Sequence, residues 1–187
     1  GFDIDEKRVK ELLNNVDRND DIDLKSLKIL TQNSNLTSDP SNIKSCNIFI
    51  VTVPTPINVD KTPDLQPIIA SSKLIGGLLT KNSIVVFEST VYPGVTDDIC
   101  TPILEKESDL VCNKDFSTGY SPERIVPGDK VNTLVKIKKI TSGSTPEIAE
   151  KVDELYKSII TAGTYKAKSI KVAEAAKVIE NTQRDLN

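Results

Sequence analysis

Two polar side chains near the end of the chain have the types and the spacing of an oxyanion-stabilising pair. Lys177 and Asn181 lie four residues apart, on one helical stripe with the apolar residues Ile170 and Ala173. An ammonium group there can stabilise a negative charge developing on an oxygen atom, while the Asn181 amide fixes its position. The alternative is a solvent-exposed helix face that carries two ion pairs, Glu174–Lys177 and Glu180–Arg184.

A carboxylate and a guanidinium group stand side by side in the stretch YSPERIVPGDK, residues 120–130. Glu123 follows a turn that Pro122 holds rigid, so its carboxylate can orient a water molecule or accept a proton. Arg124 is its immediate neighbour. The alternative is a surface ion pair, since exposed pairs are common and weak.

Hydroxyl groups follow an apolar run in the stretch ESTVYPG, residues 88–94. Ser89 and Thr90 come directly after the run, and Gly94 opens the next expected helix. Hydroxyls together with the N–H groups of a helix start suit a phosphate, a ribose or an ordered water. Plain helix capping explains the same residues equally well.

Two further strand ends carry polar residues. The prolines of VPTP, residues 53–56, hold a rigid rim around Thr55, which can supply a hydroxyl group beside a flat ring; a rigid turn is the alternative. Asp3 ends the opening run GFDID, where a dinucleotide-binding fold places an acid that accepts hydrogen bonds from ribose hydroxyls. A turn or a helix cap is the alternative for Asp3.

The composition excludes several classes of protein. The net charge is −3 and the charges are interspersed, so neither a nucleic-acid stripe nor a polybasic membrane patch is indicated. No apolar run approaches the roughly 20 residues of a membrane span, and we expect a cytoplasmic protein. Histidine is absent and the cysteines share no C-x-x-C spacing, so we expect no metal site. Buried structural thiols are the expected state of the three cysteines, Cys46, Cys100 and Cys112.

The apolar patterning predicts strands that alternate with helices. Strands are expected at residues 1–5, 47–54, 83–90 and 115–123. Helices are expected at residues 6–16, 24–30, 64–79, 94–107, 144–159 and from about 170 onward. The β-branched run at 47–54 suits a strand that is buried on both faces. We therefore predict an α/β fold with a doubly wound parallel sheet, in which ligands bind at the carboxyl ends of the strands.

Five stretches in this order and spacing resemble the UDP-glucose/GDP-mannose dehydrogenase family of nucleotide-sugar 6-dehydrogenases. They are GFDIDEKRV, VTVPTP, ESTVYPGVT, GYSPERIVPGDK and AEAAKVIENTQRDLN, and together they cover nearly the whole chain. The sequences YSPER with PGDK, and ENTQRD, look most like members that oxidise UDP-N-acetylhexosamines for bacterial surface polysaccharides. The resemblance implies a Rossmann-like domain that binds NAD.

The resemblance also implies roles for the residues that contact the cofactor. Asp3 looks like the acid that binds the adenosine ribose, and Arg8 like the basic residue over the adenosine. Thr55 falls in the cofactor-contacting loop, and Thr90 is similar to the threonine that helps to hold a catalytic water near the nicotinamide.

On the substrate side, Glu123 resembles the glutamate that handles water and protons during thioester hydrolysis, with Arg124 beside it. Lys177 and Asn181 resemble the pair that steadies the oxyanion at C6 of the sugar. The family oxidises a primary alcohol to a carboxylate in two NAD-dependent steps, through an aldehyde that a cysteine captures as a thiohemiacetal and then holds as a thioester. No cysteine here has the Gly-rich setting of that nucleophile, so we expect the nucleophile to lie outside this chain.

We accordingly expect two parts in the chain. Residues 1–168 are expected to form an NAD-binding Rossmann-like domain without its first strand and glycine loop. Residues 169–187 are expected to begin a helix that links to a domain for the UDP-sugar substrate and through which the full-length protein forms a homodimer. The chain alone is expected to be inactive. The alternative is a non-catalytic nucleotide-binding or scaffold domain of the same fold.

Overall fold

The computed structural model describes residues 1–19, 22–125 and 133–187, and the chain divides into two compact units, Gly1–Ser45 and Cys46–Asn187. The first unit contains α1 Glu6–Leu13, α2 Leu24–Asn33 and the 3₁₀ helix η1 Pro40–Ile43. Aspartate caps set where both α-helices begin, because Asp5 and Asp23 accept hydrogen bonds from the first free N–H groups. The strand expected at 1–5 is reduced to a single parallel bridge between Phe2 and Thr37, since the chain turns at once into the cap of α1.

The second unit is built on a five-stranded sheet in the order β1-β2-β3-β4-β5. Its strands are β1 Ile48–Val51, β2 Ile84–Phe87, β3 Ser117–Tyr120, β4 Lys139–Gly143 and β5 Thr164–Lys166. Its helices are α3 Gln66–Gly76, η2 Val95–Cys100, α4 Thr101–Ser108, η3 Leu134–Lys136, α5 Pro146–Lys157 and α6 Ile170–Leu186. The strands β1, β2 and β3 are parallel, β4 runs antiparallel to β3, and β5 is parallel to β4. The predicted α/β fold is confirmed, with a mostly parallel sheet.

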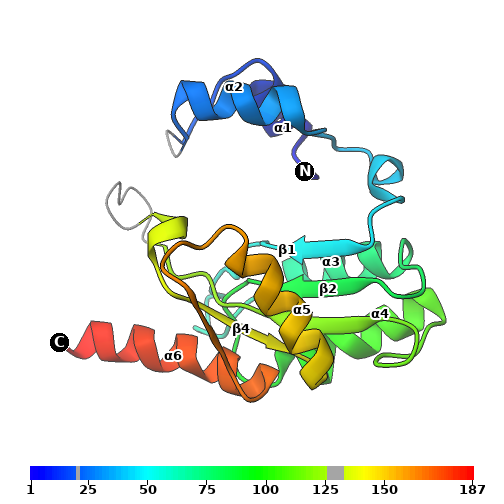
Figure 1. Cartoon of the computed structure of the whole chain (residues 1–187), viewed down its shortest axis with the longest axis vertical. Helices are drawn as coiled ribbons and strands as arrows, with labels where there is room; N and C mark the ends of the chain where they lie inside the picture. The colour runs from blue at the N-terminus through cyan, green and yellow to red at the C-terminus, as the bar shows by residue number, and fades with distance from the viewer. Residues whose placement is uncertain (20–21, 126–132) are drawn as a thin grey trace. The chain divides into compact units, whose positions relative to one another are not determined.

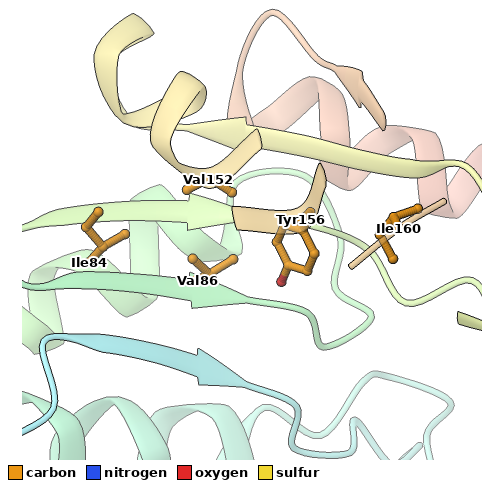
Figure 2. Close-up of a cluster of buried hydrophobic side chains, with 5 residues drawn as sticks. All are labelled: Ile84, Val86, Val152, Tyr156 and Ile160. Atoms are coloured by element: carbon orange, nitrogen blue, oxygen red, sulfur yellow. The ribbon is translucent and has the colours of Figure 1, made fainter. Parts of the chain in front are cut away.

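Helices cover both faces of this sheet (Figure 1): α5 packs on β3, β4 and β5, while α3 packs against β1 and α4. A cluster of buried side chains joins β2 to α5. Figure 2 shows its members, which are Ile84, Val86, Val152, Tyr156 and Ile160. Removing these apolar groups from water stabilises the contact by roughly 1.5–3 kcal/mol for each large side chain. The Tyr156 hydroxyl also donates a hydrogen bond to Glu88, which directly follows β2, so the cluster is tied to the residue at the carboxyl end of that strand.

The prediction that the strand at 47–54 is buried on both faces is wrong. Phe49 and Val51 are buried, but Ile48 and Ile50 are 44% and 47% exposed. The strand β1 is an edge strand of the sheet that the structure describes, and its Ile48 pairs with Ile84 on the face that α5 covers. Because α5 packs on β3 to β5, it does not extend far enough to bury Ile48 and Ile50 on this edge strand.

The helix expected at 94–107 forms in two parts, the π-helix η2 and then α4. Pro102 stands in the first turn of α4 and has no N–H group for a regular α-helical hydrogen bond. A wider turn before it accommodates the proline ring. Among the described residues, no helix is both long and apolar enough to cross a membrane.

Candidate functional site

The carboxyl ends of the parallel strands β1, β2 and β3 lie along one edge of the sheet. Hydrogen bonds join the segments that leave these ends. The Ser89 hydroxyl donates to the Val53 carbonyl at 2.6 Å, and the Tyr120 hydroxyl donates to the Ser89 carbonyl at 3.1 Å. The Glu123 N–H group lies 3.4 Å from the Glu88 carbonyl. The three segments VPTP, ESTVYPG and YSPER are therefore tied to one another.

Lys177 reaches this edge from α6. It is only 8% exposed, and its ammonium group donates a hydrogen bond to the backbone carbonyl of Glu123. Burial is the main cause that lowers the pKa of Lys177, whereas the nearby carboxylates of Glu180 and Glu123 favour its charged form. The structure thus brings Lys177 and Glu123 together, as a buried cation against a carbonyl.

The two ion pairs of the solvated-face alternative have different outcomes. Glu180 does pair with Arg184 at 3.0 Å. The pair between Glu174 and Lys177 does not form, because Glu174 is fully buried and its carboxylate is engaged elsewhere. The helix is therefore solvated on part of its circumference only, and Lys177 lies on the buried part.

Arg124 binds α6 rather than its neighbour Glu123. Its guanidinium group makes a bidentate pair with Glu180, at 2.9 and 3.0 Å, and also donates to the Lys138 carbonyl at 2.6 Å. The Glu123 carboxylate instead accepts from the Ile125 N–H group at 2.6 Å. The interpretation of Glu123 and Arg124 as a mutual surface ion pair is wrong. The rest of the motif, residues 126–130, lies outside the described residues.

Thr90 is exposed and Asn181 half-buried, and neither side chain makes a hydrogen bond to any residue that the structure describes. Both groups belong to the same unit as Lys177 and Glu123. Thr90 follows Ser89 directly, so the bonds that hold Ser89 also fix the main chain at Thr90.

The hydroxyl of Thr55 is buried and has no hydrogen-bond partner in the described part of the chain. An unpaired buried hydroxyl is unfavourable by about 1–3 kcal/mol, so such a group often marks a place where a ligand binds. The flanking prolines have no N–H groups and cannot satisfy it. A cofactor contact at Thr55 stays a prediction, with which the unpaired hydroxyl is compatible.

Asp3 and Arg8 lie in the first unit, and the structure brings them together only with residues of that unit. Asp3 is exposed and accepts a hydrogen bond from the Asp5 N–H group at 2.9 Å, which is the turn geometry of the alternative interpretation. Arg8 pairs with Asp17 at 2.7 Å, while its second terminal nitrogen is buried without a partner among the described residues. That nitrogen, like the Thr55 hydroxyl, is suited to a ligand.

The expectation that all three cysteines are buried is wrong for Cys46 and only partly met by Cys112. Cys100 is buried, Cys112 is partly buried and Cys46 is exposed. Burial raises the pKa of the Cys100 thiol to about 11, which makes it a poor nucleophile near neutral pH. The expectation that the catalytic nucleophile lies outside this chain stays a prediction.

Two buried charged groups at this edge were missed in the sequence. Glu88 binds Lys139 at 2.6 Å and accepts a hydrogen bond from the Tyr156 hydroxyl. Glu174 accepts hydrogen bonds from the N–H groups of Gly94 and Thr96. These two helix-start donors are therefore not available to a phosphate, and the suggestion from the sequence that they could bind one is wrong. A signal for both was present, since Glu88 ends the run IVVF and Glu174 lies on the buried stripe of α6.

A mostly parallel sheet with polar groups at its carboxyl edge is the arrangement of dinucleotide-binding domains. The chain belongs to the UDP-glucose/GDP-mannose dehydrogenase family, whose NAD binding domain matches residues 1–160. The resemblance found in the sequence is thereby confirmed.

Among its relatives, the chain is 58% identical over its full length to the UDP-N-acetyl-D-glucosamine 6-dehydrogenase of Pseudomonas aeruginosa, and 54% identical to the protein CapL of Staphylococcus aureus. It spans 44% of the length of each. Among solved structures, the UDP-D-ManNAc dehydrogenase of Pyrococcus horikoshii matches 99% of this chain and 44% of its own, with a TM-score of 0.88 at 29% identity.

Proposed function

We propose that this chain is the NAD-binding part of a nucleotide-sugar 6-dehydrogenase. The intact enzyme would oxidise the C6 alcohol of a UDP-N-acetylhexosamine to the uronic acid in two NAD-dependent steps, for surface polysaccharide biosynthesis. The observation that carries the chemistry is the burial of Lys177 against the turn of Glu123, at the carboxyl edge of the sheet. The substrate class is supported by the full-length similarity to a UDP-N-acetyl-D-glucosamine 6-dehydrogenase.

Four residues are proposed to hold NAD. The exposed carboxylate of Asp3 would accept hydrogen bonds from the adenosine ribose, and Arg8 would lie over the adenosine. Thr55 would use its unpaired hydroxyl, and Thr90 would contact the nicotinamide side. When bound, NAD supplies the acceptor for the hydride that leaves C6.

The remaining roles belong to the substrate. The Lys177 ammonium would stabilise the negative charge that develops on the C6 oxygen, and the Asn181 amide would donate to the same oxygen. The Glu123 carboxylate would take the proton of the attacking water, which Thr90 helps to hold. Arg124 would bind on the substrate side, with its guanidinium oriented by Glu180.

The proposal extends to the domains, the assembly and the location. Residues 1–168 would form the NAD-binding domain and residues 169–187 the start of a central helix; the cap of α6 at Ser169 supports this boundary. Since the curated relatives are about twice as long, we propose that this part alone is inactive. We also propose a homodimer formed through α6 and a cytoplasmic location.

An assay of the intact protein tests this function. The protein should reduce two NAD for each UDP-N-acetylhexosamine consumed, measured by absorbance at the NADH band together with product analysis over a panel of UDP-sugars. A protein that binds NAD but oxidises no member of the panel would instead be the non-catalytic scaffold of the same fold.

The choice of cofactor tests the proposed role of Asp3. A carboxylate at the ribose accepts from its hydroxyls and repels a 2′-phosphate, so NAD should bind more tightly than NADP. Asp3→Asn should weaken the binding of NAD by about tenfold, which corresponds to the loss of one hydrogen bond to a charged group. The same substitution should reduce the difference in affinity between NAD and NADP. Equal binding of NAD and NADP by the unaltered protein, measured by calorimetry, would contradict the role.

A further inference from the structure

One carboxylate joins the helix of Lys177 to the turn of Thr90. Glu174 on α6 is fully buried, and its two oxygens accept three hydrogen bonds from the start of η2. The Gly94 N–H group donates to Oε2 at 2.6 Å, while the Thr96 N–H and hydroxyl groups donate to Oε1 at 3.0 and 2.7 Å. The partners lie about 80 residues apart in the chain, so this contact is a tertiary one.

Gly94 has a backbone conformation that residues other than glycine rarely adopt. Its φ of +105° lies in the region that favours glycine, and a Cβ atom there would come within 2.6 Å of the Asp98 carboxylate. This backbone turn aims the Gly94 N–H at Glu174. The first N–H groups of a helix have no partner within it, and a carboxylate is the acceptor that the positive end of the helix favours.

The position of Glu174 relates it to the proposed chemistry. It precedes Lys177 by three residues on α6, and Gly94 follows Thr90 by four. A shift of Glu174 against Gly94 would therefore move the Lys177 ammonium relative to the Thr90 hydroxyl. A misplacement of about 1 Å in such a site lowers the rate by roughly 10²-fold.

We propose that Glu174 is a positioning residue, which holds α6 in register against residues 88–96 so that Lys177 and Thr90 act on the same substrate carbon. The inference rests on the proposed function. Glu174 would touch neither substrate nor cofactor, because its oxygens are buried against Gly94 and Thr96. A merely structural carboxylate would change stability and leave turnover per folded enzyme unaltered.

The test uses Glu174→Gln in the intact protein, because the amide keeps the size of the side chain but sets an N–H₂ group against an N–H donor. We expect kcat to fall by roughly tenfold or more, while KM for the UDP-sugar changes by less than about threefold. Thr96→Val should give a smaller fall, and Thr96→Ser, which keeps the hydroxyl donor, should restore it. The matched control is Lys171→Gln, which removes an exposed ion pair between α6 and Asp98 of η2 and should change kcat by less than about twofold.

A double variant decides whether Glu174 acts through Lys177. In a Lys177→Ala background, Glu174→Gln should lower kcat by less than about twofold further, since the group that it positions is gone. An undiminished second fall, or a kcat near wild type in Glu174→Gln alone, would overturn the proposal.

Amide hydrogen exchange separates this inference from the proposed function. Glu174→Gln should speed the exchange of the Gly94 and Thr96 amides by about tenfold relative to those of β2. Unchanged exchange rates in Glu174→Gln would overturn the proposed positioning contact even in an active enzyme. If the wild-type protein oxidises no UDP-sugar, both the proposed function and the catalytic role of the Glu174 contact are rejected. The exchange rates then still decide whether Glu174 holds α6 against Gly94 and Thr96.

Discussion

Lys177 has surroundings unlike those of a surface lysine. It is nearly buried and donates to the Glu123 carbonyl, and burial lowers its pKa. A carbonyl offers a hydrogen bond without neutralising the ammonium charge, so that charge remains available to an oxyanion.

Replacing Lys177 or Asn181 by alanine should therefore reduce turnover more than substrate binding. If each group acts on the developing oxyanion, its loss should lower kcat in the intact enzyme by ~10²- to 10³-fold, with a smaller change in KM. Steady-state kinetics with folded variants gives both numbers. Lys171→Ala, on the exposed side of the same helix, is the control. Near-normal turnover in Lys177→Ala would return Lys177 to a purely structural role.

A second buried cation, Lys139, belongs to a network of three side chains. Its ammonium lies 2.6 Å from Glu88 and 5.2 Å from the ring centre of Tyr156, whose hydroxyl donates to the same carboxylate. Burial, and then the charge of Glu88, raises the pKa of Tyr156, so the phenol remains a donor at any ordinary pH.

Removing one member of this network should be strongly destabilising. Lys139→Met leaves a buried carboxylate without its counter-ion and should lower the free energy of unfolding by about 3–5 kcal/mol. Tyr156→Phe should lower it by about 1–3 kcal/mol, because only a neutral donor is lost. Urea unfolding of the intact protein measures both. Lys81→Met, at an exposed pair with Asp115, should change it by less than about 1 kcal/mol, and a similar small effect at Lys139 would argue against a buried pair.

At the scale of elements, α6 is fastened to the loop after β3 by the bidentate pair of Arg124 and Glu180. The hydrogen bond from Arg124 is the largest cause that holds the pKa of Glu180 below its ordinary 4.5, and Arg184 adds to it. Because the folded-state pKa is the lower one, this pair stabilises the fold above pH 4.5, and the stabilisation is lost as the pH falls through the folded-state value.

The stability of Glu180→Gln should accordingly depend on pH in a defined way. The variant should be less stable than the wild type by about 1 kcal/mol at pH 7, and the two unfolding midpoints should converge below about pH 4.5. Denaturant unfolding at a series of pH values measures the difference. Arg184→Gln, which breaks only the exposed pair within the helix, should show a smaller gap. A gap that stays constant down to pH 3 would contradict the assignment.

The sequence predicted the strands β1 to β3 and the α-helices of this fold, but it missed the strands β4 and β5 and several contacts between distant segments. Strand and helix periodicity located β1 and α6 correctly, because those patterns are local. The exposure of Ile48 depends on how far α5 extends over the sheet, which no local pattern records. The pairing of Arg124 with Glu180 likewise spans 56 residues, whereas the sequence offered only the neighbouring Glu123 as a partner.

At the scale of the whole molecule, α6 carries a second face, which bears exposed apolar groups. Val172, Ile179 and Leu186 follow one another at intervals of seven residues, so they lie on one side of the helix, and they are 49%, 65% and 82% exposed. Lys177 and Asn181 are offset by about half a turn from this stripe. An apolar stripe with a seven-residue repeat is typical of a helix that packs against another helix.

This stripe makes the proposed homodimer testable in the intact protein. Ile179→Glu places a charge in the middle of the stripe, and burying that charge in a helix–helix contact is unfavourable, so the dimer should dissociate at least tenfold more readily. The matched control is Ile159→Glu, the same substitution at a residue that is 49% exposed and lies outside α6. Sedimentation equilibrium should show a weakened dimer for Ile179→Glu alone, with the circular dichroism of both variants like that of the wild type. If the dimer survives Ile179→Glu unchanged, the subunit contact lies elsewhere. This apolar face of α6 would then pack within a single chain.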